Sequence, residues 1–124
     1  MTEHAPQGRH LLATFHGCPA KLLDDEGFLC SVVAQAAAAA GATVLQVIAH
    51  HFAPQGVTAL ALLAESHASL HTYPEQGLAF WDCFTCGPTC DPERSLATLV
   101  EALQPAVIEH QLVVRETTTT DMHA

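Results

Sequence analysis

The sequence predicts an α+β domain, a two-layer sandwich in which an antiparallel sheet carries two helices on one face. The order of local patterns is strand, helix, several consecutive strands, helix and strand. The connections between the central strands are too short for the crossovers that parallel strands need. The length of 124 residues, with 49% hydrophobic content, suits a single domain with an ordinary core.

The first two elements are a strand and a helix. Residues 10–16 form a short apolar run bounded by glycines, which indicates a strand. Residues 19–40 favour a helix, because Pro19 and an acidic cluster suit its start and an alanine run favours its body. Gly41 suits its end, and Gly27 is a position where the helix can split.

Three or four strand-like segments follow, separated by turns that contain proline and glycine. These segments are 43–52, 57–65, 67–73 and 78–84. A second helix is expected next, with Asp91 as its N-cap and Pro92 at its first position. Its apolar face consists of Leu96, Leu99, Val100 and Leu103. A closing strand is expected at 107–114 and a flexible tail at 116–124.

Both faces of the expected sheet are apolar. The side chains Leu60, Leu62, Phe80 and Phe84 alternate with alanine or other apolar neighbours. Two helices on one face leave the other face solvated or covered by a partner. We therefore expect a homodimer that shields the second face.

The composition excludes several classes of protein. A formal charge of -9, with only four Lys and Arg, argues against nucleic-acid binding and favours either solubility or a cationic small molecule. The sequence has no apolar run long enough to span a membrane and no secretory signal, so we expect a cytoplasmic protein. Five cysteines, an odd number, indicate reduced thiols rather than a disulfide framework.

Cysteine and histidine suggest two other functions. Cys83 and Cys86 form a C-x-x-C pair, as in redox sites and zinc half-sites, but strand alternation places them on opposite faces. A metal site remains a remote alternative, which would make the chain a non-enzymatic metal-binding module. Its candidate ligands are His50, His51, Cys90 and Asp91. Our first expectation is no metal.

The segment 65–72 holds the strongest candidate for chemistry. Ser66 follows Glu65 and is close in sequence to His67 and His71, a combination that suggests a covalent mechanism. The chain contains no G-x-S-x-G elbow, so an ordinary serine hydrolase is poorly supported. We expect Ser66 to be the reactive centre of a small enzyme.

Several motifs in the correct order resemble those of the short prokaryotic S-adenosylmethionine decarboxylases, a pyruvoyl-dependent family. They are GRHL at 8–11, GAT at 41–43, FAPQGV at 52–57, LAESH at 63–67, HTYPE at 71–75 and FTCG at 84–87. The resemblance runs in register from about Gly8 to Leu103.

The resemblance implies a proenzyme that cleaves itself between Glu65 and Ser66. Ser66 Oγ attacks the carbonyl of Glu65, and elimination of the ester leaves a beta chain, 1–65, and an alpha chain, 66–124. Ser66 becomes a pyruvoyl group, the implied cofactor. This group forms a Schiff base with S-adenosylmethionine and accepts the electrons left by CO2. The product is an aminopropyl donor for spermidine, a polyamine.

The resemblance also assigns the residues that assist Ser66. His71 is the processing base, and Thr58 supplies a hydroxyl that supports processing, where many relatives carry serine. Cys86 donates the proton that replaces CO2 during turnover.

Three further residues are implied to bind the substrate. Phe52 stacks on adenine, and Glu75 accepts hydrogen bonds from the ribose hydroxyls. Tyr73 stands where the family often has tryptophan. This departure leaves pyruvoyl-dependent decarboxylation of arginine or ornithine, on the same fold, as the alternative function.

Overall fold

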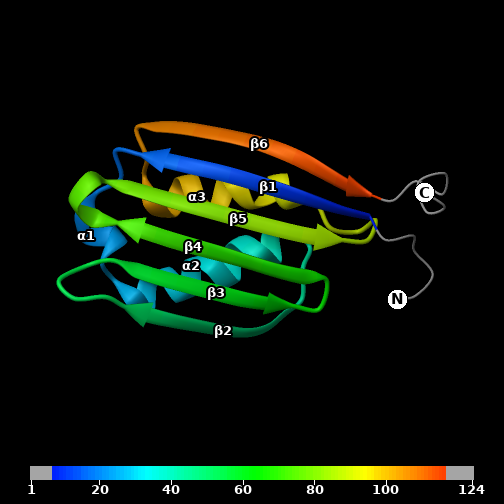
Figure 1. Cartoon of the computed structure of the whole chain (residues 1–124), viewed down its shortest axis with the longest axis horizontal. Helices are drawn as coiled ribbons and strands as arrows, with labels where there is room; N and C mark the ends of the chain where they lie inside the picture. The colour runs from blue at the N-terminus through cyan, green and yellow to red at the C-terminus, as the bar shows by residue number, and fades with distance from the viewer. Residues whose placement is uncertain (1–6, 117–124) are drawn as a thin grey trace, which may run out of the picture.

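The computed structural model describes residues 7–116 and contains one six-stranded sheet (Figure 1). Its strands are β1 (Gln7–His16), β2 (Val44–His51), β3 (Val57–Leu63), β4 (Ser66–Tyr73), β5 (Leu78–Cys86) and β6 (Val107–Glu116). Its helices are α1 (Ala20–Leu23), α2 (Glu26–Ala39) and α3 (Ser95–Leu103), with 3-10 turns η1 (Pro74–Gln76) and η2 (Pro92–Arg94). The strand order is β2-β3-β4-β5-β1-β6, and every neighbouring pair is antiparallel.

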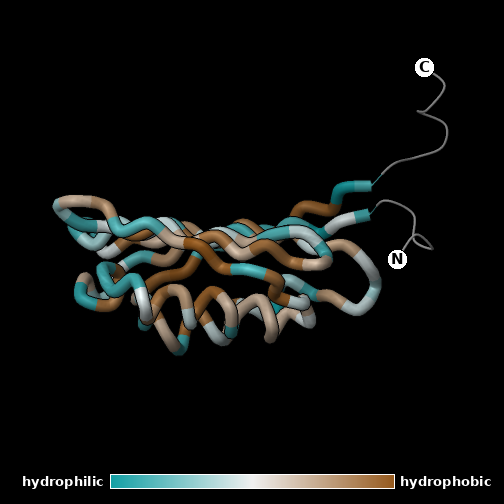
Figure 2. The backbone as a smooth tube through the Cα atoms, turned by 90° about the horizontal axis from the view of Figure 1, so that it is seen from below, coloured by the Kyte–Doolittle hydropathy of each residue, from teal (hydrophilic) through white to brown (hydrophobic). Residues whose placement is uncertain are grey.

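The helices form one layer and the sheet forms the other (Figure 2). Helices α2 and α3 contact each other, and α2 also packs on β2 and β3. Within residues 7–116, no helix covers the other face of the sheet (Figures 1 and 2). The expected α+β two-layer sandwich is therefore confirmed.

The first helical segment breaks at a different place from the one expected. The sequence predicts one helix over 19–40, with Gly27 as a position where it can split. The structure instead has two helices, α1 and α2, with a break at Asp24 and Asp25. The side chain of Asp25 accepts a hydrogen bond from the backbone N–H of Phe28 at 3.1 Å. Asp is a favoured N-cap, so this bond fixes the start of α2 and places Gly27 inside its first turn.

The other boundaries differ by a few residues. Asp91 caps η2 by accepting from the N–H of Glu93 at 3.1 Å, and α3 begins only at Ser95. The expectation that Glu116 belongs to the tail is wrong, because Glu116 pairs with Gln7 in the β1–β6 ladder. The remainder of the expected tail lies outside the described residues.

The core lies between the sheet and the helices. Every second side chain of β1, β3, β4 and β5 points into it, as strand alternation requires. The core includes Leu11, Phe15, Leu29, Val33, Leu70 and Leu99. Trp81 is 1% exposed, and its indole Nε1 donates to Ser95 Oγ at 3.0 Å. Burial of each large apolar side chain stabilises the fold by about 1.5–3 kcal/mol.

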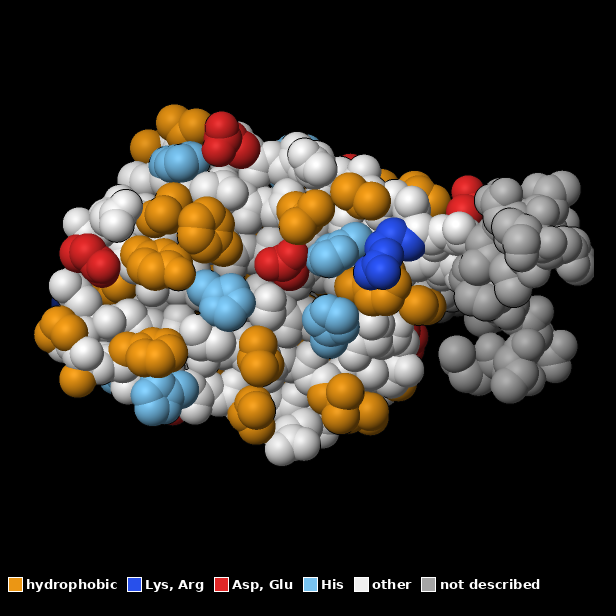
Figure 3. Space-filling model, viewed as in Figure 1, with side chains coloured by type: hydrophobic (Ala, Val, Ile, Leu, Met, Phe, Trp, Pro, Cys, Tyr) orange, Lys and Arg blue, Asp and Glu red, His pale blue; other side chains and the backbone are white. Residues whose placement is uncertain are grey.

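The uncovered face of the sheet is rich in apolar side chains (Figure 3). Its exposed members include Ile48 at 54%, Leu60 at 41%, Leu62 at 54% and Phe80 at 37%. Side chains of histidine lie among the apolar ones on this face. We call this surface the open face. Among residues 7–116, no helix is long and apolar enough to cross a membrane.

Candidate active site

Ser66 has a strained backbone. It is the first residue of β4, directly after the turn that follows β3, and its φ angle is 152°. This region of φ favours glycine, and a non-glycine residue held there costs about 1–3 kcal/mol. The strained backbone angle therefore adjoins the Glu65–Ser66 peptide bond, which the resemblance implies is cut.

Glu65, the residue before Ser66, accepts hydrogen bonds at both its backbone carbonyl and its side chain. The carbonyl oxygen of Glu65 accepts a hydrogen bond from the backbone N–H of Cys86 at 3.1 Å. Its carboxylate accepts from Thr43, at 2.9 Å from the backbone N and 3.2 Å from Oγ1. The N–H of Cys86 polarises the Glu65 carbonyl, which makes its carbon easier to attack.

The hydroxyl of Ser66 contacts one imidazole. Ser66 Oγ lies 3.2 Å from Nδ1 of His67, and the ring of His67 lies 5.8 Å from that of Phe84. The sequence placed His67 beside Ser66 but gave it no role. Its contact with Ser66 depends on the backbone angle of Ser66, which the sequence pattern does not reveal.

Thr85 is a second residue that sequence reasoning missed. It pairs directly with Ser66 in the β4–β5 ladder, and it is 1% exposed. Its Oγ1 is buried without a hydrogen-bond partner among the described residues. Directly paired residues of antiparallel strands are neighbours, so this hydroxyl lies beside position 66. Its only signal in the sequence is its place in the FTCG motif.

The two cysteines of the C-x-x-C pair lie on opposite faces of β5, as expected. Cys83 is buried in the core, and burial, followed by the nearby Cys90 and Asp82, raises the pKa of its thiol to about 12. Cys86 is only partly buried. This arrangement does not support a redox pair. Within residues 7–116, no three side chains of His, Cys, Asp or Glu are grouped to hold a metal ion.

His71 and Thr58 form a second group, separate from Ser66. Thr58 Oγ1 lies 3.0 Å from His71 Nδ1, and the two residues pair in the β3–β4 ladder. His71 is five residues beyond Ser66 on the same strand, a separation of about 17 Å. Within one chain, the structure therefore does not bring the expected processing base to Ser66.

The expected substrate-binding residues lie toward the same end of the sheet as His71. Phe52 follows β2, is 47% exposed, and contacts the ring of His50 at 4.5 Å. Tyr73 ends β4, and Glu75 is exposed in η1 directly after it. The β2–β3 and β3–β4 turns lie at opposite ends of the sheet (Figure 1). The chain thus has a Ser66 end and a His71 end.

The loop after Phe52 is anchored to α1. The carboxylate of Asp24, at the end of α1, accepts from the N–H of Gly56 at 2.9 Å and lies 2.8 Å from His51 Nε2. The hydrogen bond from Gly56, followed by that of His51, lowers the pKa of Asp24. An ionised Asp24 therefore fixes the loop at the His71 end.

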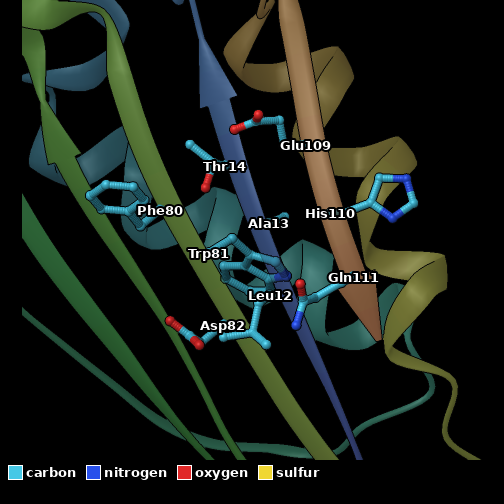
Figure 4. Close-up of a pocket in the computed structure, with 9 residues that line it drawn as sticks. All are labelled: Leu12, Ala13, Thr14, Phe80, Trp81, Asp82, Glu109, His110 and Gln111. Carbon is cyan, nitrogen blue, oxygen red and sulfur yellow. The ribbon is translucent and has the colours of Figure 1, made fainter. Parts of the chain in front are cut away.

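A hollow of about 530 Å³ lies on β1, β5 and β6 (Figure 4). Its lining is Leu12, Ala13, Thr14, Phe80, Trp81, Asp82, Glu109, His110 and Gln111. None of the expected site residues is among them. The hollow adjoins the His71 group through Phe80, which pairs with His71 in the β4–β5 ladder and whose ring lies 5.7 Å from that of Tyr73.

The sequence profile described as S-adenosylmethionine decarboxylase matches residues 9–116. The chain belongs to the S-adenosylmethionine decarboxylase family. It is 47% identical to the "S-adenosylmethionine decarboxylase proenzyme" of Brevibacillus brevis over 91% of this chain and 85% of that protein. It is 50% identical to the protein of the same name from Parasynechococcus marenigrum, over 78% of this chain and 76% of that one.

The family also appears among solved structures. The crystal structure of the adenosylmethionine decarboxylase from Aquifex aeolicus VF5 superposes with a TM-score of 0.83 at 32% identity. The alignment covers 93% of this chain and 95% of that one. The resemblance seen in the motifs of S-adenosylmethionine decarboxylases is therefore confirmed over nearly the whole chain.

Proposed function

We propose that the chain is a proenzyme that cleaves its own Glu65–Ser66 bond and then decarboxylates S-adenosylmethionine. The observation that carries this proposal is the strained Ser66 beside a carbonyl held by the N–H of Cys86. The name "proenzyme" in relatives at 47% and 50% identity supports it. The expected setting is the cytoplasm, where free thiols such as Cys86 persist.

Self-cleavage begins within one chain. Ser66 Oγ bonds to the carbonyl carbon of Glu65, and the peptide C–N bond breaks, which leaves an ester and a free amine on residue 66. Removal of the α-proton of residue 66 then expels the Glu65 carboxylate. Water hydrolyses the remaining dehydroalanine to a pyruvoyl group and ammonia. The hydrogen bond from Cys86 N–H at 3.1 Å favours the first step, because charge develops on the Glu65 oxygen.

The residues around position 66 fit a pyruvoyl group. The hydroxyl of Thr85, which has no hydrogen-bond partner within residues 7–116, is available to donate to an oxygen of the pyruvoyl group. A pyruvoyl group acts as an electron sink when an amino acid loses CO2. The thiol of Cys86, partly exposed at the same end of the sheet, returns a proton to the substrate carbon.

The separation of Ser66 from His71 supports a homodimer with shared sites. A base must reach the α-proton of residue 66, yet His71 is about 17 Å along the same strand. A second copy, related by a two-fold axis and facing the open face, places the His71 end of one chain at the Ser66 end of the other. The exposed Ile48, Leu60 and Leu62 then become buried at the interface.

The same arrangement supports a nucleoside substrate. Phe52, Tyr73 and Glu75 lie toward the His71 end, so each active site would combine them with Ser66 and Cys86 of the other chain. An exposed aromatic ring can stack on adenine, and a carboxylate can accept hydrogen bonds from ribose hydroxyls. The net charge of -9 favours a cationic sulfonium compound.

Mass spectrometry of the intact protein tests self-cleavage. Wild type should give two fragments, 1–65 and 66–124, with a carbonyl at the new N-terminus that borohydride reduces. Ser66→Ala should remain whole. CO2 release should then be measured from S-adenosylmethionine, arginine and ornithine in parallel. An uncut wild type without a carbonyl contradicts the mechanism, and turnover of arginine or ornithine alone contradicts the substrate.

Mixing two inactive variants tests the shared site. Ser66→Ala lacks the nucleophile and His71→Ala lacks the base, so neither should cleave alone. When the two are co-expressed, the His71→Ala chain should be cut, because its partner supplies His71. Cleavage of neither chain in the mixed dimer would show that each chain uses its own histidine.

A further inference from the structure

The hydroxyl of Ser66 contacts His67, the neighbouring residue, and this contact is unusual for a strand. Neighbouring side chains of a regular strand point to opposite faces and do not meet. Here Ser66 Oγ lies 3.2 Å from His67 Nδ1, because the φ angle of 152° turns Ser66 out of the regular strand. The unusual backbone angle of Ser66 therefore brings its hydroxyl to an imidazole.

We propose that His67 is the base that activates Ser66 for self-cleavage, a step distinct from the one assigned to His71. The inference rests on the proposed self-cleavage and adds a catalytic residue to it. A distance of 3.2 Å is within the range over which a general base removes a proton. Histidine is suited to this role, because neutral imidazole has one nitrogen free to accept a proton.

The step balances without a further reactant. Nδ1 of His67 takes the hydroxyl proton as Ser66 Oγ bonds to the carbonyl carbon of Glu65. The C–N bond then breaks, and the departing nitrogen of Ser66 receives a proton from His67. The imidazole returns to its neutral form, and the chain is an isomer of its starting state with an ester in place of an amide.

The surroundings of His67 suit a side chain that must keep its place but remain accessible. Its ring lies 5.8 Å from Phe84 and lines a hollow of about 370 Å³ whose other members include Leu60 and Leu62. This packing limits the orientations of the ring. His67 is nevertheless exposed in the single chain.

The two histidines should stop self-cleavage at different stages. Without His71, the ester forms but the α-proton stays, so ester accumulates. Without His67, the hydroxyl is not activated and the amide stays intact. Hydroxylamine distinguishes these states, because it cuts an ester under conditions that leave a peptide bond whole.

The experiment compares His67→Ala and His67→Asn with wild type, His71→Ala and His110→Ala. Asn keeps a hydrogen-bond acceptor near the position of Nδ1 but is not a base. His110 is an exposed histidine of β6, a strand separated from β4 by β5 and β1, and serves as the matched control. Purified proteins are followed by intact mass with and without hydroxylamine, and circular dichroism checks that each is folded.

We expect both His67 variants to cleave about 100-fold more slowly than wild type or worse. They should resist hydroxylamine, whereas His71→Ala should be cut by it and His110→Ala should process normally. Normal cleavage in either folded His67 variant, or an ester that accumulates in either, would overturn the proposal for His67. An uncut wild type would instead overturn the proposed function itself.

Discussion

The backbone N–H of Cys86 donates to the carbonyl oxygen of Glu65 across 3.1 Å. In the proposed mechanism Cys86 has two separable contributions, one from its backbone N–H to self-cleavage and one from its thiol to turnover. A substitution that removes only the thiol keeps the N–H in the same place.

Cys86→Ala should therefore still cut the Glu65–Ser66 bond, but it should lose sustained decarboxylation. Without the proton donor, protonation at the wrong carbon consumes the pyruvoyl group by transamination. Fragment masses and the time course of CO2 release measure the two effects, with Cys30→Ala as a control on α2. Full, lasting turnover of Cys86→Ala would identify another acid as the donor.

Thr58 and His71 should act as a pair. Thr58→Val removes the hydroxyl that lies 3.0 Å from Nδ1 of His71 and nearly preserves the side-chain shape. Loss of one hydrogen bond should slow cleavage by up to about tenfold. Thr58→Ser keeps the hydroxyl and should cleave at nearly the wild-type rate. Equal rates for the serine and valine variants, followed by intact mass over time, would show that the hydroxyl does not assist.

Thr85 should contribute to the site rather than to stability. Its buried Oγ1 has no partner among the described residues, and an unpaired buried hydroxyl costs about 1–3 kcal/mol. In a Ser66→Ala background, which keeps the chain whole, Thr85→Val should leave the melting temperature unchanged or raise it. With Ser66 present, the same change should slow decarboxylation. A large loss of stability in the uncut protein would mean that the hydroxyl is bonded after all.

The thiols of β5 should react differently with alkylating agents. At neutral pH, iodoacetamide should modify Cys86 and spare Cys83, because Cys83 is buried and its pKa is raised to about 12. The thiolate is the reactive form, so a raised pKa suppresses reaction at neutral pH. Peptide mass mapping before and after denaturation measures this, since unfolding should expose both thiols. Equal labelling in the native protein would contradict the assigned faces.

Asp24 should make the loop at the His71 end sensitive to acid. Its folded pKa is lowered by the hydrogen bonds from Gly56 and His51, so its stabilising effect is present above an unfolded pKa of about 3.9. This stabilisation is lost as the pH falls through the lowered pKa of Asp24 in the folded protein. Asp24→Asn should abolish this part of the pH dependence. The melting temperatures of wild type and Asp24→Asn, measured at a series of acidic pH values below the unfolded pKa, test this.

Most of the fold could be predicted because its signals are local. Short turns at Pro54–Gly56 and Pro74–Gly77 require antiparallel neighbours, and Asp91 with Pro92 marks the start of the second helical region. The break before α2 was misplaced because aspartate capping by Asp25 outweighed the flexibility of Gly27.

The sequence identifies candidate site residues, but it does not predict their arrangement. LAESH is contiguous, so Ser66 and its neighbours could be recognised from the sequence. The contact of Ser66 with His67 depends on one backbone angle, and the unpaired hydroxyl of Thr85 depends on strand register. The distance between Ser66 and His71 appears only when both are placed on β4. These are three-dimensional properties that motif spacing does not contain.

The place of β1 in the sheet determines what remains after the chain is cut. β1 belongs to the segment before Ser66, yet both of its neighbours, β5 and β6, belong to the segment after it. On the far side, β3 of the first segment pairs with β4 of the second. Cleavage at Ser66 would therefore give two products that pair along three ladders, and they would not dissociate without unfolding. A single peptide cut would create the pyruvoyl group and leave the six-stranded sheet intact.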